Sequence, residues 1–259
     1  MSMEDGDDEG DFEQEFEPGY EDPEHIKWHA LRAALDSLVL FDPYLGMQAT
    51  NLGVVDEFIT SLEYTTLRED DENRDISALV FLNAQSQLWI FGVYELLRTW
   101  RSRVKDVLKW DENGGLPLKI KALRKDKGFL HAGEQMLADQ LESVQSDPAI
   151  IGRIREDLRM THILFGQIEF LRVSLAKHEV SGKAKALAFA PGYGRINKWC
   201  GALDYEMSAG RVILGVINRR NIADGIRKFL DRSDIPTPEA IRALDDFMNL
   251  KEPPSFDIE

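Results

Sequence analysis

An arginine and a histidine in the second half of the chain have a spacing that could support acid–base chemistry. Arg172 and His178 are separated by five residues, in a segment whose apolar residues recur with the period of a helix. A guanidinium group can bind a phosphate through parallel hydrogen bonds. A histidine titrates near neutral pH and can therefore act as a general acid or base.

This motif resembles the short arginine-to-histidine motif of HEPN-type helical nucleases, small all-helical domains that often dimerise and cut RNA without a metal. The resemblance implies that Arg172 would bind the scissile phosphate and that His178 would act as acid or base. It covers seven residues, and Val173 stands where a polar residue often follows the arginine. Many unrelated helices contain an arginine and a histidine so spaced, and a structural role is the alternative.

Two similar segments suggest a second candidate site. Residues 91–98 and 165–172 match at five of eight positions, and each has a glutamate three residues before an arginine. Residues at this spacing are neighbours on one helix surface. The pattern predicts either ion pairs at the edge of the core, which would fix helix register, or a polar pocket between two central helices. A duplicated hairpin, with its glycines at close helix contacts, and coincidence both explain the similarity. The four charged residues are Glu95, Arg98, Glu169 and Arg172.

Other combinations that could carry chemistry are weaker. His25 and His29 lie one turn apart with Asp36 on the same stripe, but Arg32 between them would repel a cation. Residues 191–195 lack the upstream strand and the Lys-Ser/Thr pair of a nucleotide-binding loop and are typical of a turn. The sequence therefore predicts no metal site and no cofactor.

Positive charge is concentrated between residues 98 and 127, where ten basic side chains stand against four acidic ones. The segment joins the end of one helix to the start of the next, so these charges should lie close together. Such a surface could bind nucleic-acid phosphates, and an ordinary solvated surface is the alternative. The residues predicted to bind are Arg98, Arg101, Arg103, Lys105, Lys119, Lys121 and Arg124.

The first 24 residues carry twelve acidic side chains and no lysine or arginine. They account for most of the net charge of −15, because removing them leaves 34 acids against 31 bases. Self-repulsion and low hydrophobicity predict a disordered acidic tail. One hypothesis is that this tail folds back over residues 98–127 and competes with an anionic ligand.

Helices are the elements expected to position these side chains. No stretch shows convincing strand alternation except residues 186–190, which are too few to build a sheet. The chain therefore predicts an all-α, multi-helix bundle with long central helices, in which residues 25–250 form one domain between the acidic tail and a C-terminal tail at 251–259. The predicted helices are 25–40, 51–67, 75–110, 118–145 (in one piece or two), 147–179, 195–231 (with a break near Gly210 or Asn221) and 238–249.

Composition favours a cytoplasmic protein. Cys200 is the single cysteine, which excludes an internal disulfide, and no signal peptide is visible at the N-terminus. Residues 78–97 are long enough for a membrane span, but their polar side chains favour the buried helix of a soluble protein. We expect a binding or regulatory protein that acts through protein contacts and the basic patch, with an RNase as the alternative; the residues do not decide whether it is an enzyme. A helix that is apolar all round would also accommodate a homodimer seam.

Overall fold

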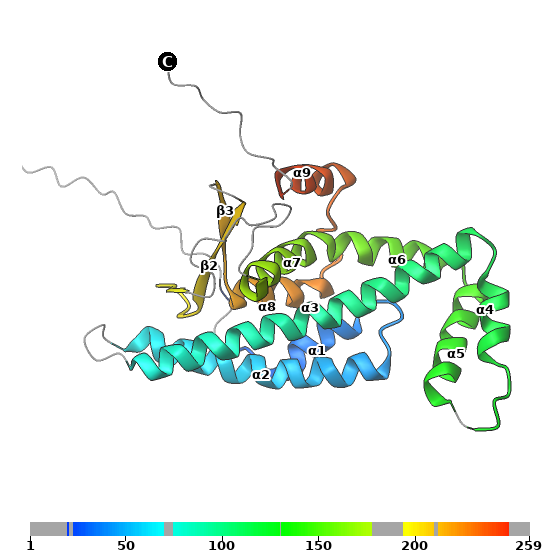
Figure 1. Cartoon of the computed structure of the whole chain (residues 1–259), viewed down its shortest axis with the longest axis horizontal. Coiled ribbons are helices and arrows are strands. Elements are labelled where there is room, and N and C mark those ends of the chain that lie inside the picture. Colours follow the sequence, from blue (N-terminus) through cyan, green and yellow to red (C-terminus); the bar gives the residue numbers. More distant parts are fainter. Residues whose placement is uncertain are drawn as a thin grey trace, which may run out of the picture.

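The computed structural model describes residues 20, 23–69, 75–129, 131–177, 194–209 and 212–248. The fold is mostly all-α with a small antiparallel sheet, which confirms the predicted fold class (Figure 1). Of the predicted terminal tails, 1–24 and 251–259, the described residues include Tyr20, Pro23 and Glu24.

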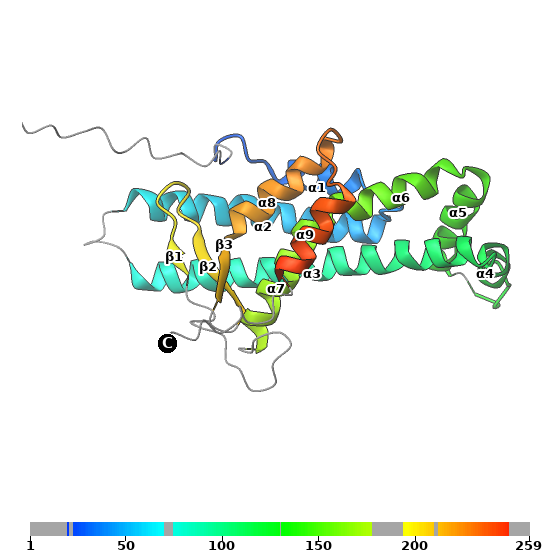
Figure 2. The ribbon, with the colours of Figure 1, turned by 90° about the horizontal axis from the view of Figure 1, so that it is seen from above.

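Two long antiparallel helices, α2 (Pro43–Arg68) and α3 (Ile76–Glu112), form a hairpin along the length of the molecule (Figures 1 and 2). The carboxylate of Asp75 accepts a hydrogen bond from the Ser77 backbone N–H at 2.8 Å, as predicted for an N-cap. The predicted start of α2 at residue 51 is wrong. The helix starts eight residues earlier, because Asp42 caps it and Pro43 occupies the first position, where its missing N–H costs nothing.

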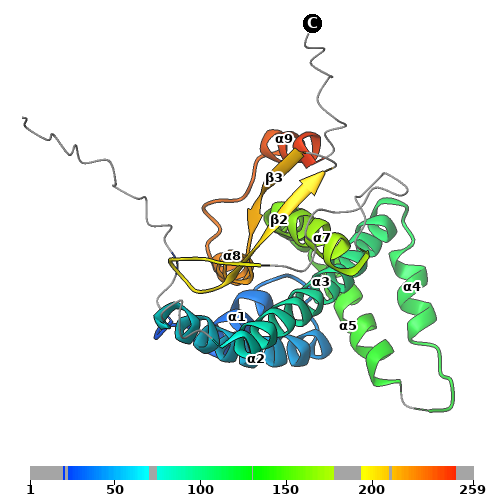
Figure 3. The ribbon, with the colours of Figure 1, turned by 60° about the vertical axis from the view of Figure 1, so that its left-hand side comes forward.

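The remaining helices lie on the hairpin or at its end. Helix α1 (Trp28–Asp36) packs against α2, and α4 (Leu116–Leu123) and α5 (Ala132–Ser146) stand at one end of the hairpin (Figure 3). The predicted helix 118–145 is therefore two helices. The predicted helix 147–179 is also divided, into α6 (Ala149–Met160) and α7 (His162–Lys177). The division falls at Thr161, whose hydroxyl donates back to the Asp157 carbonyl oxygen and accepts from Arg101.

The predicted helix 195–231 is wrong over its first half. Residues there form β1 (Arg195–Ile196), β2 (Leu203–Ala209) and β3 (Val212–Ile217), antiparallel in the order β1-β2-β3. In β2 the side chains of Leu203, Tyr205 and Met207 are buried and those between them less so, which is the period of a half-buried strand. The short predicted strand at 186–190 lies outside the described residues.

After β3 the chain returns to helix. Helix α8 (Arg219–Arg227) continues into the 3₁₀ turn η2 (Lys228–Leu230), and α9 (Pro238–Met248) follows. The Ala240 backbone N–H donates to the Thr237 hydroxyl at 3.2 Å, as the predicted cap requires.

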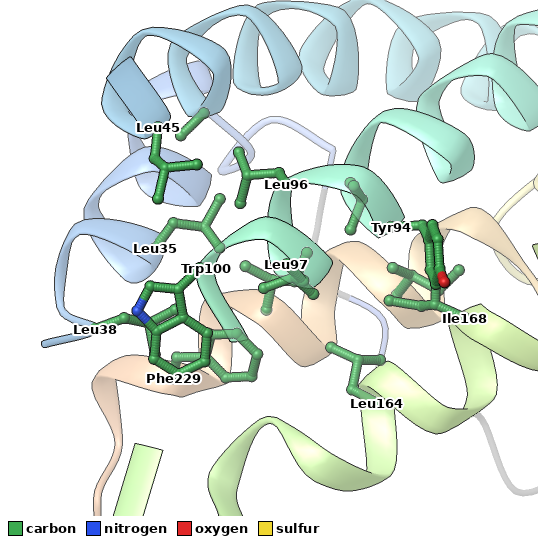
Figure 4. Close-up of a cluster of buried hydrophobic side chains, with 14 of the residues drawn as sticks. Leu35, Leu38, Leu45, Tyr94, Leu96, Leu97, Trp100, Leu164, Ile168 and Phe229 are labelled. Atoms are coloured by element: carbon green, nitrogen blue, oxygen red, sulfur yellow. The ribbon is translucent and has the colours of Figure 1, made fainter. Parts of the chain in front are cut away.

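The apolar core lies between the hairpin and the elements packed on it. Figure 4 shows Leu35, Leu97, Trp100, Ile168 and Phe229 converging from α1, α3, α7 and η2. The Trp100 indole N–H donates to the Val39 carbonyl oxygen at 2.9 Å, so burying this polar atom does not leave it without a partner.

The glycines of the two similar segments behave differently. A Cβ at Gly92 would lie 2.9 Å from Leu52 Cδ2, so α2 and α3 do approach closely there. The close contact predicted at Gly166 is wrong for the part of the chain that the structure describes, because a Cβ at this position would meet none of its atoms within 4 Å.

Candidate functional site

The structure describes one residue of the predicted nuclease pair, Arg172. Arg172 lies on α7 with its guanidinium over the Tyr94 ring, 4.7 Å from the centroid. His178 lies outside the described residues. The proposed acid–base role therefore stays a prediction.

The four charged residues of the similar segments do not converge on one pocket. Glu95 and Arg98 form an ion pair at 2.6 Å with both side chains about half exposed. Glu169 instead accepts a hydrogen bond from the Tyr94 hydroxyl at 3.2 Å. Tyr94 of α3 thus joins Glu169 and Arg172 of α7, while the first pair lies at the surface.

Most of the predicted basic patch has partners that the sequence did not reveal. Arg124 contacts Asp139 and Glu142, both on α5, which follows the basic run in the chain. Arg103 pairs with Asp42, and Lys119 lies over the Trp110 ring. Lys105 and Lys121 are exposed and pair with no acidic side chain in the described part of the chain. Pairing lowers the net positive charge of this surface.

Arg101 is buried rather than part of the surface. It donates to the Leu158 carbonyl oxygen at 3.1 Å, and burial lowers its pKa to about 10. Its Nη2 also lies 3.5 Å from Nδ1 of His162, whose Nε2 lies 2.8 Å from Asp245. Because arginine only donates, Nε2 carries the proton in this arrangement. Both ring nitrogens are therefore occupied, and the contact joins α9 to α7.

A closed network of charges lies inside the domain and was missed from the sequence. Arg219, at the start of α8, contacts Asp56, Thr60 and Glu63 on the inner face of α2, and all four side chains are buried. Burial disfavours the charged guanidinium, but the carboxylates of Glu63 and Asp56 outweigh it and raise the pKa of Arg219. The sequence did contain a signal for this network, because positions 56, 60 and 63 place three polar side chains on one stripe of α2.

A second polar cluster lies where β1, β2 and α8 meet, and Tyr20 contacts it. We call Asn197, Asn218 and Asn221 the asparagine cluster. Their Nδ2 groups converge on the hydroxyl oxygen of Tyr20, at 3.4, 3.1 and 3.3 Å respectively. The carboxylate of Asp204 on β2 accepts from Asn218 at 2.7 Å and from Asn197 at 3.1 Å. A single tyrosine of the acidic segment is thus held by side chains far away in the sequence.

Cys200 lies beside this cluster, and its thiol donates to Asn197 Oδ1 at 3.5 Å. Burial raises the pKa of the thiol to about 11. The nucleophilic thiolate form is therefore disfavoured at neutral pH.

The thiol should make stability fall at alkaline pH. A folded-state pKa above the unfolded value means that the contribution is complete below about pH 9 and is lost as the pH rises towards 11. We expect the wild-type protein to lose about 1.4 kcal/mol more than Cys200→Ala between pH 8 and 10. Urea unfolding of both proteins at the two pH values measures the difference. Equal losses would show that the thiol titrates normally.

A cleft of about 480 Å³ lies between α7, α8 and the 231–236 segment. Met160, Leu164 and Phe229 contribute apolar surface, and Lys228, Asp231 and Asp234 are polar lining residues. No three His, Cys, Asp or Glu side chains among the described residues could hold a metal ion.

The outer face of the α2–α3 hairpin has a different character. Helix α3 carries no charged residue from Ile76 to Tyr94, and on α2 between Met47 and Thr65 the carboxylates of Asp56 and Glu63 are buried. Glu57, the remaining charge of this stretch, accepts from the Trp28 backbone N–H at 2.9 Å. Apart from this partly buried carboxylate, these stretches of the hairpin present an uncharged surface in a chain of which 30% is charged.

This neutral face is also apolar. Its large side chains recur at helical spacing, and Phe58 of α2 meets Phe81 of α3 edge to face at 6.5 Å. Among the described helices α3 is long and apolar enough to cross a membrane, and 28% of its apolar window is buried. The neutral face consists of Met47, Gln48, Asn51, Val54, Phe58 and Ser61 of α2 with Ser77, Val80, Phe81, Ala84 and Leu88 of α3, all exposed.

No family model matches this chain, and no curated protein or solved structure is significantly similar to it. Function must therefore be argued from these surfaces and clusters themselves.

Proposed function

We propose that this protein is a binding protein whose functional unit is a dimer, formed when the neutral face of one copy packs on that of a second. The observation that supports this is the exposure of large apolar side chains on stretches of α2 and α3 where Glu57, which accepts from the Trp28 backbone N–H, is the one charge that is not buried. Phe58 is 51% exposed, Leu88 63% and Met47 66%. Contiguous apolar surface of this kind marks interaction sites, because leaving it in water forfeits the free energy of burial.

A second copy is favoured over a charged partner by electrostatics. A twofold interface brings each residue close to the symmetric surface of its partner, so like charges on the face would repel. The neutral face has none. It also offers no complementary charge by which an acidic or basic partner could be selected. An uncharged apolar surface therefore suits pairing with itself.

The size of the face fits a small interface. The 14 residue steps from Met47 to Ser61 correspond to about 21 Å of helix, and two helices side by side are about 20 Å wide. The resulting footprint of about 420 Å² is about half of the roughly 800 Å² of accessible surface that each partner of a standard interface buries. Two hairpins packed in this way would form a four-helix bundle, with the Phe58–Phe81 contact near its middle.

A membrane surface fits the face less well. Interfacial helices combine an apolar face with basic residues that meet anionic headgroups. Here Gln48, Asn51 and Ser61 interrupt the apolar stripe, and Lys and Arg are absent from the exposed part of both helices along the face.

Replacing Phe58 with glutamate should convert the dimer into a monomer. Two carboxylates would be buried in an apolar interface, and we expect dimer affinity to fall at least 100-fold, or about 3 kcal/mol. Light scattering after gel filtration should give twice 29.5 kDa for the wild type and 29.5 kDa for the variant. Circular dichroism should be unchanged, because the side chain is exposed in the single chain.

Leu118→Glu is the matched control, since Leu118 is 73% exposed on α4, away from the neutral face, and this variant should remain dimeric. A wild-type monomer at 100 µM, or a dimeric Phe58→Glu protein, contradicts the proposal. Flotation of the wild type, but not of Phe58→Glu, with phosphatidylglycerol-containing vesicles would assign the face to membranes instead.

A further inference from the structure

The asparagine cluster is arranged so that its amide N–H groups can point only one way. Asn218 Oδ1 accepts from the Asn221 backbone N–H at 2.8 Å, and Asn221 Oδ1 accepts from the Asn218 backbone N–H at 3.0 Å, a reciprocal cap of α8. Asn197 Oδ1 accepts from the backbone N–H groups of Trp199 and Cys200. Each amide oxygen is thus occupied by the backbone, which leaves each Nδ2 to face the common point.

The groups around this common point favour a hydroxyl group over an anion. Asn197 and Asn218 each have two N–H bonds, and each directs one to Asp204 and one to the Tyr20 oxygen. These donors are neutral, and the carboxylate of Asp204 lies among them. A phosphate or carboxylate would therefore be repelled by Asp204, whereas a phenol oxygen can accept from the amides without bringing a charge. Tyr20 also hydrogen-bonds the side chain of Cys200.

We propose that the asparagine cluster is a tyrosine-binding site whose occupant is the chain's own Tyr20. The occupant belongs to an acidic peptide, because Glu17, Glu21 and Asp22 surround Tyr20 in the sequence. The site attaches the acidic segment at the junction of the strands and α8. This junction lies away from the end of the hairpin where α4 and α5 stand (Figure 2). Tyr20 is held by noncovalent contacts alone in the part of the chain that the structure describes, so a tyrosine-bearing acidic peptide can replace it.

A peptide exchange experiment on the full-length protein tests this. A fluorescent peptide of residues 12–24 and its Tyr20→Phe version are titrated against the wild type and against full-length Tyr20→Ala, and binding is followed by polarisation. In the wild type the chain's own tyrosine occupies the site. We therefore expect the Tyr20→Ala protein to bind the tyrosine peptide at least ten-fold more tightly than the wild type does, and at least five-fold more tightly than it binds the phenylalanine peptide.

The two peptides differ by one oxygen atom, so a folding defect cannot imitate their difference. Equal binding of both peptides to Tyr20→Ala would assign the interaction to the acidic side chains alone and would overturn the proposal. Absence of binding up to 1 mM peptide would overturn it as well.

Cys200 gives an independent readout within the same chain, because it is the single cysteine. Tyr20→Ala should increase the rate of its reaction with dithionitrobenzoate at least five-fold. Tyr44→Ala, which removes an exposed tyrosine from α2, should leave the rate unchanged. A rate unaffected by Tyr20→Ala would show that Tyr20 does not occupy this site in solution.

Discussion

Arg219→Met should destabilise the protein by about 3–5 kcal/mol, the usual cost of removing one partner from a buried ion pair. Arg219 donates to Glu63 through Nε at 2.7 Å and to the Thr60 hydroxyl through Nη2 at 2.9 Å, and it also contacts Asp56. Methionine fills similar volume but donates no hydrogen bond. Asp56 would keep Arg227, and Glu63 would keep a longer ion pair with Arg220 at 3.9 Å. Two carboxylates would then remain buried without the hydrogen bonds and the positive charge that Arg219 supplies.

Guanidinium-induced unfolding, followed by circular dichroism, measures the loss. The protein concentration is held fixed, because the stability of the proposed dimer would depend on it. Arg242→Met is the matched control. Its partner Glu239 is three residues away on a helix surface, and both side chains are about 70% exposed, in contrast to the buried pair of Arg219. This variant should change stability by less than about 0.5 kcal/mol. Similar effects of the two substitutions would mean that the internal network contributes no more than a surface pair.

Gly201→Ala should be comparably damaging for a different reason. Gly201 has φ +72°, and a Cβ there would lie 1.9 Å from the carbonyl oxygen of Glu63. The neighbour is backbone of a central helix, so it cannot move aside without disturbing α2. We expect a loss of about 3–5 kcal/mol, the sum of a left-handed conformation and a steric overlap in a packed region.

Gly128→Ala separates these two contributions. Gly128 has φ +75°, but a Cβ there would meet no atom of the described residues within 4 Å. This control should lose only the conformational part, about 1–2 kcal/mol. Thermal unfolding of both variants provides the comparison. If Gly201→Ala costs no more than Gly128→Ala, the turn before β2 does not pack on α2 as tightly as described.

The two predictions concern one contact region. Glu63 receives Arg219 from α8 through its side chain and Gly201 from the turn before β2 through its backbone. Helix α2 therefore contacts the residues just before β2 and just after β3, where the chain enters α8. Loss of either contact should weaken the attachment of the strands and α8 together.

The sequence predicted α3 and α9 well because local signals determine their ends. Asp75 caps α3, Thr237 caps α9, and the uncharged stretch of α3 indicates burial or association. The prediction of the start of α2 failed because Asp42-Pro43 suits both the end of one helix and the start of the next. The sequence did not predict β2, because the apolar residues Leu203, Tyr205 and Met207 alternate with polar ones over only a few positions. This is a weak signal beside the helix-forming residues that follow.

Composition and periodicity by themselves determined that this is a mostly helical chain with long central helices and an acidic N-terminal region, because helix formation and net charge depend on neighbouring residues. Only the tertiary structure decided where the charges find partners. It paired the basic run with acids from α5 and with the N-cap residue of α2, buried Arg219 against Asp56 and Glu63, and brought Tyr20 to Asn197 and Asn218. These contacts join residues up to 198 positions apart. Such pairs form only when packing of the whole chain brings them within hydrogen-bonding distance, so local sequence carries almost no signal for them.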